Sequence, residues 1–495
     1  MDTQPGSDTS KVKDPSRLTY ENVQTRWFVL SSYWIVIILA LPFWWRTTSI
    51  ERLSLPSHRI RAQVEERPRL AVTLALDRSS FGTQVDSVAS EVNGLLEASA
   101  SSSRWRGIDA KVVVGADEKS SYTVSAGKST VVGNRSLVLS SEDVKRPTRI
   151  AELLSDLVAP YMATADNLPE RVIQYAPRYR LAFSLLNENA ASKSGATGWD
   201  VQRAISKHFN PVLSELGLLH NFTIESQVQY HSPLAFQPEI IDNGLGLTHD
   251  QLTVFVNSAE WTLASSVSND PVLHFVLFVP SQKDMPMYIL DTAGRPANSN
   301  GFLLPQWGGV YVLNTPPDQQ ELVHLKEKDL LPVFSTFVGQ FLTLMGVANL
   351  PPDVRSLETS ALSSWQLDAL LRRRALENIH GSQDTLHSII KLVEEIENMP
   401  VGDVVRDEVQ GSLDLLEEAY RASSISPELT LKWSSQALAF ASRAFFDPGM
   451  LALLYFPAEH KYAVYTPLFA SISVPLIVAL VREFKAWKLT RQAAQ

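Results

Sequence analysis

The residues closest to a known chemical pattern follow an apolar run, where Asp77 precedes Ser79 and Ser80. The pattern Asp-x-Ser-x-Ser after a strand can hold a divalent cation, because Mg²⁺ prefers carboxylate and hydroxyl oxygens. Phe81 stands where the second serine of the pattern belongs. An aspartate that begins a turn after a strand is common without any metal. We therefore predict no metal site here.

Other side chains suited to catalysis are scattered along the chain. The motifs of zinc peptidases, serine hydrolases, P-loop NTPases, dinucleotide-binding domains and EF-hands do not occur. Six histidines have no mutual ligand spacing: His208, His220, His231, His249, His274 and His324. We interpret the run from Arg372 to Arg374 as the solvated face of a helix rather than as a patch for an acidic partner. No catalytic, cofactor-binding or metal-binding residue is predicted.

Composition excludes further classes of protein. The chain has 495 residues, 45% of them hydrophobic, so it can bury a large core. Its net charge of −9 provides no basic field for phosphates, so nucleic acid is not an expected partner. It contains no cysteine, which excludes disulfides, cysteine-ligated metals and a thiol nucleophile on this chain.

Two uncharged stretches predict transmembrane helices at residues 27–45 and 462–481. Trp44, Trp45 and Arg46 follow the first stretch, whereas a secretory signal peptide would end in small residues. The second stretch contains Pro467 and Pro475. They fit either a kinked helix packed on partner helices or ordinary prolines whose freed carbonyl groups find other donors.

Charge and glycosylation signals set the predicted topology. The tail 482–495 is basic, which places it in the cytosol, although the arginines after the first span favour the opposite orientation. The sequons at Asn134 and Asn221 can be glycosylated only in the lumen. We therefore predict a disordered cytosolic tail at 1–26, a lumenal segment at 46–461 and a cytosolic basic tail at 482–495.

The lumenal segment divides by its hydrophobic periodicity. Residues 46–320 alternate strand and helix patterns, which predicts an α/β domain with one or two sheets. The apolar runs at 251–257 and 274–281 predict strands buried on both faces. Residues 321–461 show apolar spacings of three and four, which predict a helical array. The fold class is therefore an α/β lumenal domain with a C-terminal helical array, flanked by two transmembrane helices.

Several segments resemble one known family. The most specific is AFFDPGMLALLYFPAEHKYAVYTPLF at 444–469, and others are LPFWWRTT at 41–48, LAFSLLN at 181–187, HNFTIESQ at 220–227 and QWGGVYVLN at 306–314. Together they resemble the PIG-S subunit of the glycosylphosphatidylinositol (GPI) transamidase. The Asn221 sequon lies in a block that matches the family's own Asn-Phe-Ser/Thr.

The resemblance implies a non-catalytic scaffold subunit of an endoplasmic reticulum complex that joins preformed GPI to proteins after removal of a C-terminal signal. It implies as partners a caspase-like subunit carrying the nucleophilic cysteine, GPAA, PIG-T and PIG-U type subunits, and membrane lipid including GPI. It also makes Trp307, Gly308 and Gly309 candidate contact residues, with a structural turn as the alternative. Two other functions stay open: a membrane-tethered lumenal cargo receptor and a lone lumenal hydrolase.

Overall fold

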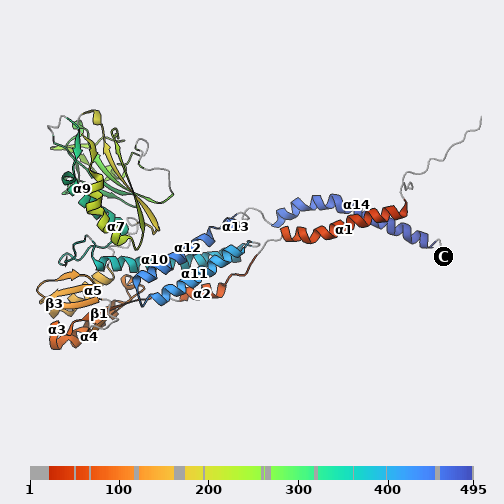
Figure 1. The fold of residues 1–495 in the computed structure, drawn as a ribbon, viewed down its shortest axis with the longest axis horizontal. Helices are drawn as coiled ribbons and strands as arrows, with labels where there is room; N and C mark the ends of the chain where they lie inside the picture. Colours follow the sequence, from red (N-terminus) through yellow and green to blue (C-terminus); the bar gives the residue numbers. More distant parts are fainter. Residues whose placement is uncertain are drawn as a thin grey trace, which may run out of the picture. The chain divides into compact units, whose positions relative to one another are not determined.

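The computed structural model describes residues 22–48, 52–65, 69–115, 122–160, 173–192, 195–257, 261, 263, 269–316, 321–360, 362–396, 399–451 and 458–492. These residues belong to two compact units (Figure 1). The membrane-helix unit lies within Met1–Ser57, Leu386–Gln410 and Ser442–Gln495. The α/β unit consists of His58–Thr385 and Gly411–Ala441. The predicted tail at 1–26 falls largely outside the described residues.

The first sheet of the α/β unit is built around a short parallel core. Its strand order is β16-β4-β5-β3-β1-β2, with β2 and β3 parallel to β1 on either side, and β4 antiparallel to β5. Its strands are β1 (Leu70–Leu76), β2 (Ile108–Val114), β3 (Tyr122–Gly127), β4 (Val131–Gly133), β5 (Ser136–Ser140) and β16 (Arg355–Ser356). The helices α3 (Arg78–Phe81), α4 (Val85–Ser99) and α5 (Pro147–Val158) accompany it. Val92, Leu96 and Leu154 of α4 and α5 pack into its core.

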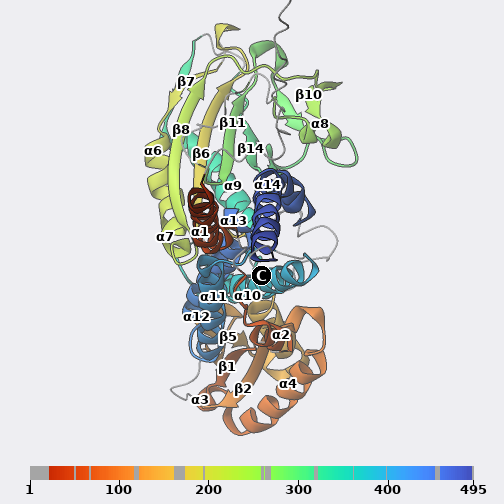
Figure 2. The same cartoon turned by 90° about the vertical axis from the view of Figure 1, so that its right-hand side faces the viewer.

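A second sheet lies further along the chain (Figure 2). Its order is β13-β14-β11-β6-β8, parallel except for β13. Its strands are β6 (Arg178–Asn187), β8 (Asn221–Gln229), β11 (Val272–Val279), β13 (Gly301–Leu304) and β14 (Gly308–Val312). Nine of the ten residues of β6 and seven of the eight residues of β11 are buried. The predicted strand at 274–281 is thus confirmed as one covered on both faces.

Helices cover one face of this second sheet. They are α6 (Val201–Ala204), a π-helical turn at Ile205–Phe209, α7 (Asn210–Leu216) and α9 (Glu327–Met345). Aromatic rings fill the layer between them: Phe183 of β6 stacks on Phe334 of α9 at 5.7 Å and on Phe275 of β11 at 5.3 Å. The first helix of the predicted 321–461 array therefore packs on the sheet.

The predicted strand at 251–257 is wrong. Residues His249–Thr253 form helix α8 instead. The Thr248 side chain accepts a hydrogen bond from Gln251 N while the Gln251 side chain accepts one from Thr248 N, which is a capping box. This local pairing outweighs the strand preference of the apolar run. Phe255 still enters the core on the opposite face of the second sheet, with Trp261 and Phe278.

Two small sheets complete the strand inventory of the described residues. One has the order β12-β10-β9 and the other pairs β15 with β7. Their strands are β7 (Ala196–Trp199), β9 (Glu239–Ile241), β10 (Gly244–Leu247), β12 (Met287–Ile289) and β15 (Val323–Leu325).

The rest of the predicted helical array is present as long helices: α10 (Ser364–Glu395), α11 (Asp403–Ala422) and α12 (Pro427–Phe445). Two short helices lie elsewhere in the chain, α2 (Ser57–Glu65) before the first sheet and α13 (Pro448–Leu451) after α12. Ser426 and Pro427 set the start of α12, because Ser426 Oγ accepts a hydrogen bond from Leu429 N and Pro427 is the first helical residue. The predicted fold class is confirmed by these elements and by the two membrane-length helices.

Candidate functional site

The membrane-helix unit contains two helices long enough to cross a bilayer. They are α1 (Val23–Thr48) and α14 (Ala458–Gln492). Each contains an apolar window, Val23–Trp44 and Ala463–Leu489, with no part buried inside the protein. Each window includes all but one residue of the corresponding predicted span, 27–45 or 462–481. Apolar surface of this length needs lipid or other helices to cover it.

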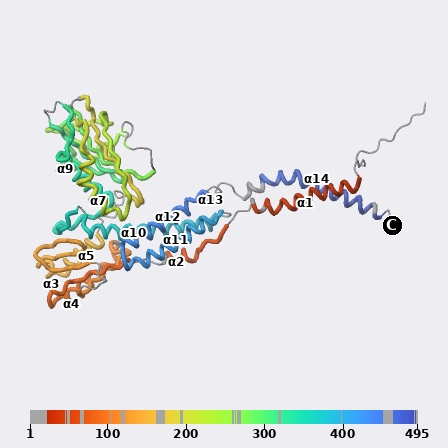
Figure 3. Tube along the Cα trace, viewed as in Figure 1, coloured from red at the N-terminus to blue at the C-terminus, as the bar shows by residue number. Residues whose placement is uncertain are grey.

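The two helices lie antiparallel and side by side (Figures 1 and 3). At one end Arg26 Nε lies 3.4 Å from Glu483 Oε1, and the rings of Trp27 and Phe484 are 6.0 Å apart. At the other end the ring of Trp44 meets those of Tyr465 and Phe469, at 5.7 and 5.1 Å. The antiparallel arrangement places the start of α1 and the end of α14 at the same end of the pair. The ion pair could not be predicted from the sequence, although Arg26 and Glu483 are charged residues that flank the two spans.

The chain leaving α1 is fixed to the same unit. Arg52 Nη2 donates a 2.5 Å hydrogen bond to Val393 O near the end of α10. Leu53 N donates to Val401 O at 3.0 Å. These bonds hold residues 52–53 against the end of α10 and against Val401, before the start of α11.

Both predicted glycosylation residues are exposed. Asn221 is the first residue of β8, an edge strand of the second sheet, where it is paired with Arg178 of β6. Asn134 lies in the turn between β4 and β5. Ser364 Oγ accepts a hydrogen bond from Arg135 N and donates one to Gly133 O, so α10 holds this turn on both sides of Asn134. The fold leaves both asparagine side chains exposed to solvent, and both remain predicted glycan sites.

Asp77 acts as a helix cap. Its carboxylate accepts hydrogen bonds from Ser79 N at 3.1 Å and from Ser79 Oγ at 2.7 Å, which hold the pKa of Asp77 below its usual range. Ser80 Oγ donates to Asp77 O and accepts from Ala126 N, so the second hydroxyl group ties the turn to β3. Across the described ranges no three His, Asp or Glu side chains converge as a metal site.

The interpretation of Arg372–Arg374 as a solvated face is wrong for two of the three residues. The side chain of Arg374 is 3% exposed, and Arg372 is equally buried. Arg372 Nη2 donates to Val158 O, the last residue of α5, and Arg374 Nη2 donates to Met345 O, the last residue of α9. Carbonyl groups at a helix C-terminus lack partners within the helix, and the helix dipole favours a cation there. These arginines therefore cap two other helices from within α10.

Trp307, Gly308 and Gly309 have structural roles. Trp307 stacks on His274 with ring centroids 4.7 Å apart, and His274 N donates to Trp307 O. A Cβ atom on Gly308 would lie 1.9 Å from His274 O, and one on Gly309 would lie 1.9 Å from Gln340 Oε1. The two glycines let β14 approach β11 and α9.

Burial keeps two histidines neutral. It lowers the pKa values of His220 and His274 to about 4. His220 Nδ1 lies 2.6 Å from Ala176 O, so this nitrogen carries the proton and donates. Among the described residues, no side-chain hydrogen bond joins either ring to a nucleophile or to a second base. The described residues thus give a membrane-anchored, well-packed α/β protein in which the polar clusters serve the fold.

Comparison with known proteins gives the family. The family model described as phosphatidylinositol-glycan biosynthesis class S protein matches residues 31–490. The Mus musculus protein named GPI-anchor transamidase component PIGS is 34% identical over 370 residues, covering 70% of this chain and 66% of that protein, just under two thirds of its length. The Schizosaccharomyces pombe GPI transamidase component PIG-S homolog is 29% identical over 517 residues, covering 98% of this chain and 89% of that protein. Because the family model matches nearly the whole chain, including most of both membrane helices, this chain belongs to the PIG-S family.

Proposed function

We propose that this chain is a non-catalytic, membrane-anchored scaffold subunit of GPI transamidase, the complex that attaches preformed GPI to proteins after removal of a C-terminal signal. The observation that carries the proposal is the family match over residues 31–490. The names of the relatives from mouse and fission yeast support it, since both are called components of this transamidase.

The absence of cysteine supports a division of labour in which another subunit supplies the thiol. A transamidation through a thioester needs a thiolate nucleophile, and this chain of 495 residues has none. We propose that a caspase-like subunit carries it, with GPAA, PIG-T and PIG-U type subunits as further partners. Membrane lipid, including GPI, would contact the exposed apolar windows of α1 and α14.

The proposed topology has both termini in the cytosol and the α/β unit in the lumen of the endoplasmic reticulum. The antiparallel pairing of α1 and α14 supports termini on one side. The exposed sequons at Asn134 and Asn221 and the basic tail after Arg482 support the orientation. We propose Asn221 as the principal glycan site, because it lies on an edge strand open to solvent.

The proposed scaffold role rests on the effective concentration of the reacting amine and thioester groups. Attack of an amine on a thioester requires placement within ångströms, and a membrane-held donor loses reactivity when it is out of register with the catalytic subunit. Two paired membrane helices, together with the Arg52 and Leu53 hydrogen bonds, hold the membrane-proximal chain at a defined place. A subunit of this kind sets geometry without taking part in bond making.

The test is purification of the tagged full chain from its own membranes in mild detergent, with mass spectrometry of stoichiometric partners. The proposal expects a caspase-like protease among them, and loss of GPI attachment in cells lacking the chain. A chain that elutes alone from cells whose GPI attachment is normal without it would overturn the proposal. Activity of the isolated chain on a GPI-accepting peptide would overturn its non-catalytic part.

A further inference from the structure

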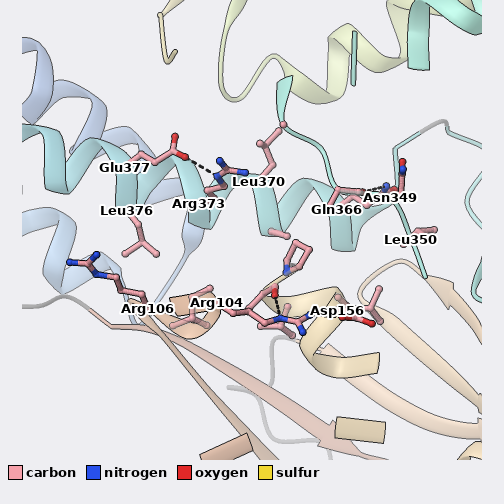
Figure 4. A pocket seen from close by; sticks show the side chains of 18 of the residues that line it. Arg104, Arg106, Asp156, Asn349, Leu350, Gln366, Leu370, Arg373, Leu376 and Glu377 are labelled. Carbon is pink, nitrogen blue, oxygen red and sulfur yellow. Dashed lines mark hydrogen bonds and ion pairs between the residues drawn. The ribbon is translucent and has the colours of Figure 1, made fainter. Parts of the chain in front are cut away.

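A cavity of about 320 Å³ lies inside the α/β unit between α5, the segment after α9, and α10 (Figure 4). It is lined by one face of α10, by Asp156–Pro160 at the end of α5, and by Gly346 and Ala348–Leu350 in the segment after α9. The start of β2 closes it with Arg106 and Ile108. These residues are separate from the helix cap at Asp77 and from the paired membrane helices α1 and α14.

Most of the cavity wall is apolar. The apolar side chains come from all four segments: Ile108, Leu157, Val158, Leu350, Leu370 and Leu376. An apolar cavity of roughly 150 Å³ accommodates one benzene ring, so this one has room for a body of roughly twelve carbon atoms. Small-molecule sites are of this kind, concave and mainly apolar with a few placed polar groups.

Some of the charged side chains at the cavity have ion-pair or hydrogen-bond partners, and others have polar atoms without a partner. Arg104 is fully engaged, because its Nη2 contacts Asp156 Oδ1 and its Nε donates to Ala159 O, both at 2.5 Å. Arg373 Nε donates to Glu377 Oε1 at 2.8 Å, but Arg373 Nη1 is buried without a partner among the described residues. Glu377 is also shared with Arg374 outside the cavity.

Arg106 is the third arginine that lines the cavity. It lines the cavity, is exposed, and has no carboxylate partner in the described part of the chain. Leu376 packs against the neighbouring Gly107, where a Cβ atom would lie 2.7 Å from Leu376 Cδ2. Figure 4 shows Arg106 beside Leu376 at one end of the cavity and Leu350 at the other. The cavity thus joins an apolar wall to one unneutralised guanidinium group.

We propose that this cavity binds a small anionic amphiphile, with its carboxylate or phosphate head at Arg106 and its aliphatic body along α10 toward Leu350. A guanidinium group binds either head through paired N–H donors. The apolar wall selects a ligand with a hydrocarbon body, and the excess of positive charge selects an anion over a cation or a neutral alcohol. This site is independent of the role of the chain in any complex.

The test uses the full chain in lipid nanodiscs and a photoreactive dodecanoate that carries a diazirine on its chain. Mass spectrometry maps the labelled peptides after competition with decanoate, decyl phosphate, decanol or decyltrimethylammonium. Labelling of α1 and α14 by probe dissolved in the bilayer is the internal baseline. We expect additional labelling of peptides from 104–108, 346–350 and 366–380, displaced by the anions and not by the alcohol or the cation.

The two anionic competitors distinguish the sources of the ligand. Stronger displacement by decanoate points to a fatty acid, and stronger displacement by decyl phosphate points to a lysophospholipid or an alkyl phosphate. Either result supports the site. Equal displacement by the cation, or labelling confined to α1 and α14, would overturn it.

Two variants and one control make the test specific. Arg106→Glu changes an exposed residue, so folding is retained, and we expect cavity labelling to fall at least about fivefold. Ala348→Trp fills the cavity from a loop and should abolish cavity labelling. Arg203→Glu reverses an equally exposed arginine on α6 and should leave labelling unchanged. Unchanged labelling in both cavity variants would contradict the proposal.

Discussion

The Tyr122 hydroxyl group donates a 2.7 Å hydrogen bond to Asp368 Oδ2, joining β3 to a helix residue 246 positions later. Arg372 Nη1 donates to the same phenol oxygen at 2.7 Å, and Arg135 pairs with both Asp368 oxygens at 2.9 and 3.0 Å. Burial raises the pKa of Tyr122 to about 12, so the phenol remains a donor at every physiological pH. One neutral hydroxyl group thus links a carboxylate and a guanidinium group that are both buried.

Tyr122→Phe should therefore destabilise the contact between the first sheet and α10 by about 2 kcal/mol, because it leaves Arg372 and Asp368 each short of one hydrogen bond. Hydrogen exchange of amides in β3 and α10 measures this locally. Tyr311→Phe is the matched control, since no partner of the Tyr311 hydroxyl group occurs in the described structure, and it should change exchange by less than about 0.5 kcal/mol. Equal effects of the two variants would contradict the network.

Reversing Arg26 should loosen one end of the membrane pair. The chain has no cysteine, so cysteines replacing Trp27 and Phe484 can be joined selectively by a bismaleimide. Arg26→Glu should lower crosslinking about fivefold, and Arg26→Glu with Glu483→Arg should restore it. A cysteine pair replacing Trp44 and Tyr465 reports the opposite end and should not respond. Failure of the double reversal to restore crosslinking would mean that the ion pair does not hold the helices.

Glycan occupancy tests the proposed orientation. Asn221→Gln should remove one glycan, seen as a mobility change that matches endoglycosidase H treatment. Asn243→Gln replaces another exposed asparagine outside a sequon and should have no effect. A sequon introduced into residues 482–495 should stay unmodified. Its modification, with Asn221 unmodified, would place the α/β unit in the cytosol.

His274 should make stability depend on pH. Its folded pKa of about 4 lies below the ordinary 6.5, so the unfolded chain takes up the proton first as pH falls. The stability is complete above pH 6.5 and decreases toward pH 4, by about 3 kcal/mol for this group. His274→Phe keeps the stack on Trp307 and removes the unpartnered Nδ1 atom.

The measurement is urea unfolding of the full chain, followed by circular dichroism between pH 7 and pH 4. The variant should match the wild type at pH 7 and lose less stability on acidification. His220 titrates in the same window in both proteins, so the wild type and variant must be compared at each pH. Parallel pH profiles would show that His274 is not the group responsible.

Glycine substitutions separate close packing from helix propensity. Gly308 has φ +156°, and its added Cβ atom would overlap the backbone of His274, so Gly308→Ala should destabilise the α/β unit by at least about 3 kcal/mol. Gly94→Ala lies in α4 with nothing within 4 Å of the added atom and should stabilise by about 0.5–1 kcal/mol. Thermal unfolding ranks the two variants. A tolerated Gly308→Ala would indicate that β14 can move away from β11.

Much of the architecture was predictable, because most elements are long enough to show a period. Strand β5 coincides with the apolar run SLVLS at 136–140, and the start of α12 is readable from Ser426 and Pro427. The short strand β16 was not, since its two residues have no period and pair with β4, more than two hundred residues earlier. The Thr248–Gln251 capping box is present in the sequence, but the continuous apolar run beside it predicts a strand.

The buried charges show why side-chain roles were harder to predict. Three consecutive arginines look like solvent-facing charge, yet Arg372 and Arg374 end at carbonyl groups of Val158 and Met345. Those acceptors become available only when α5 and α9 terminate beside α10. No local sequence pattern predicts that the ends of α5 and α9 lie beside α10. The cavity near Arg106 has the same origin, because its walls come from four separate segments.

The pairing of α1 with α14 also imposes an order in time. Arg26 and Glu483 stand at opposite ends of the sequence. At a synthesis rate of roughly 5–20 residues per second, about 20–90 seconds pass between the appearance of one and of the other. For that interval the first membrane helix exists without its partner, and its Trp44 and Arg26 face lipid or another protein. A helix-binding chaperone or an early subunit contact would have its opportunity in that interval, which ends when α14 arrives.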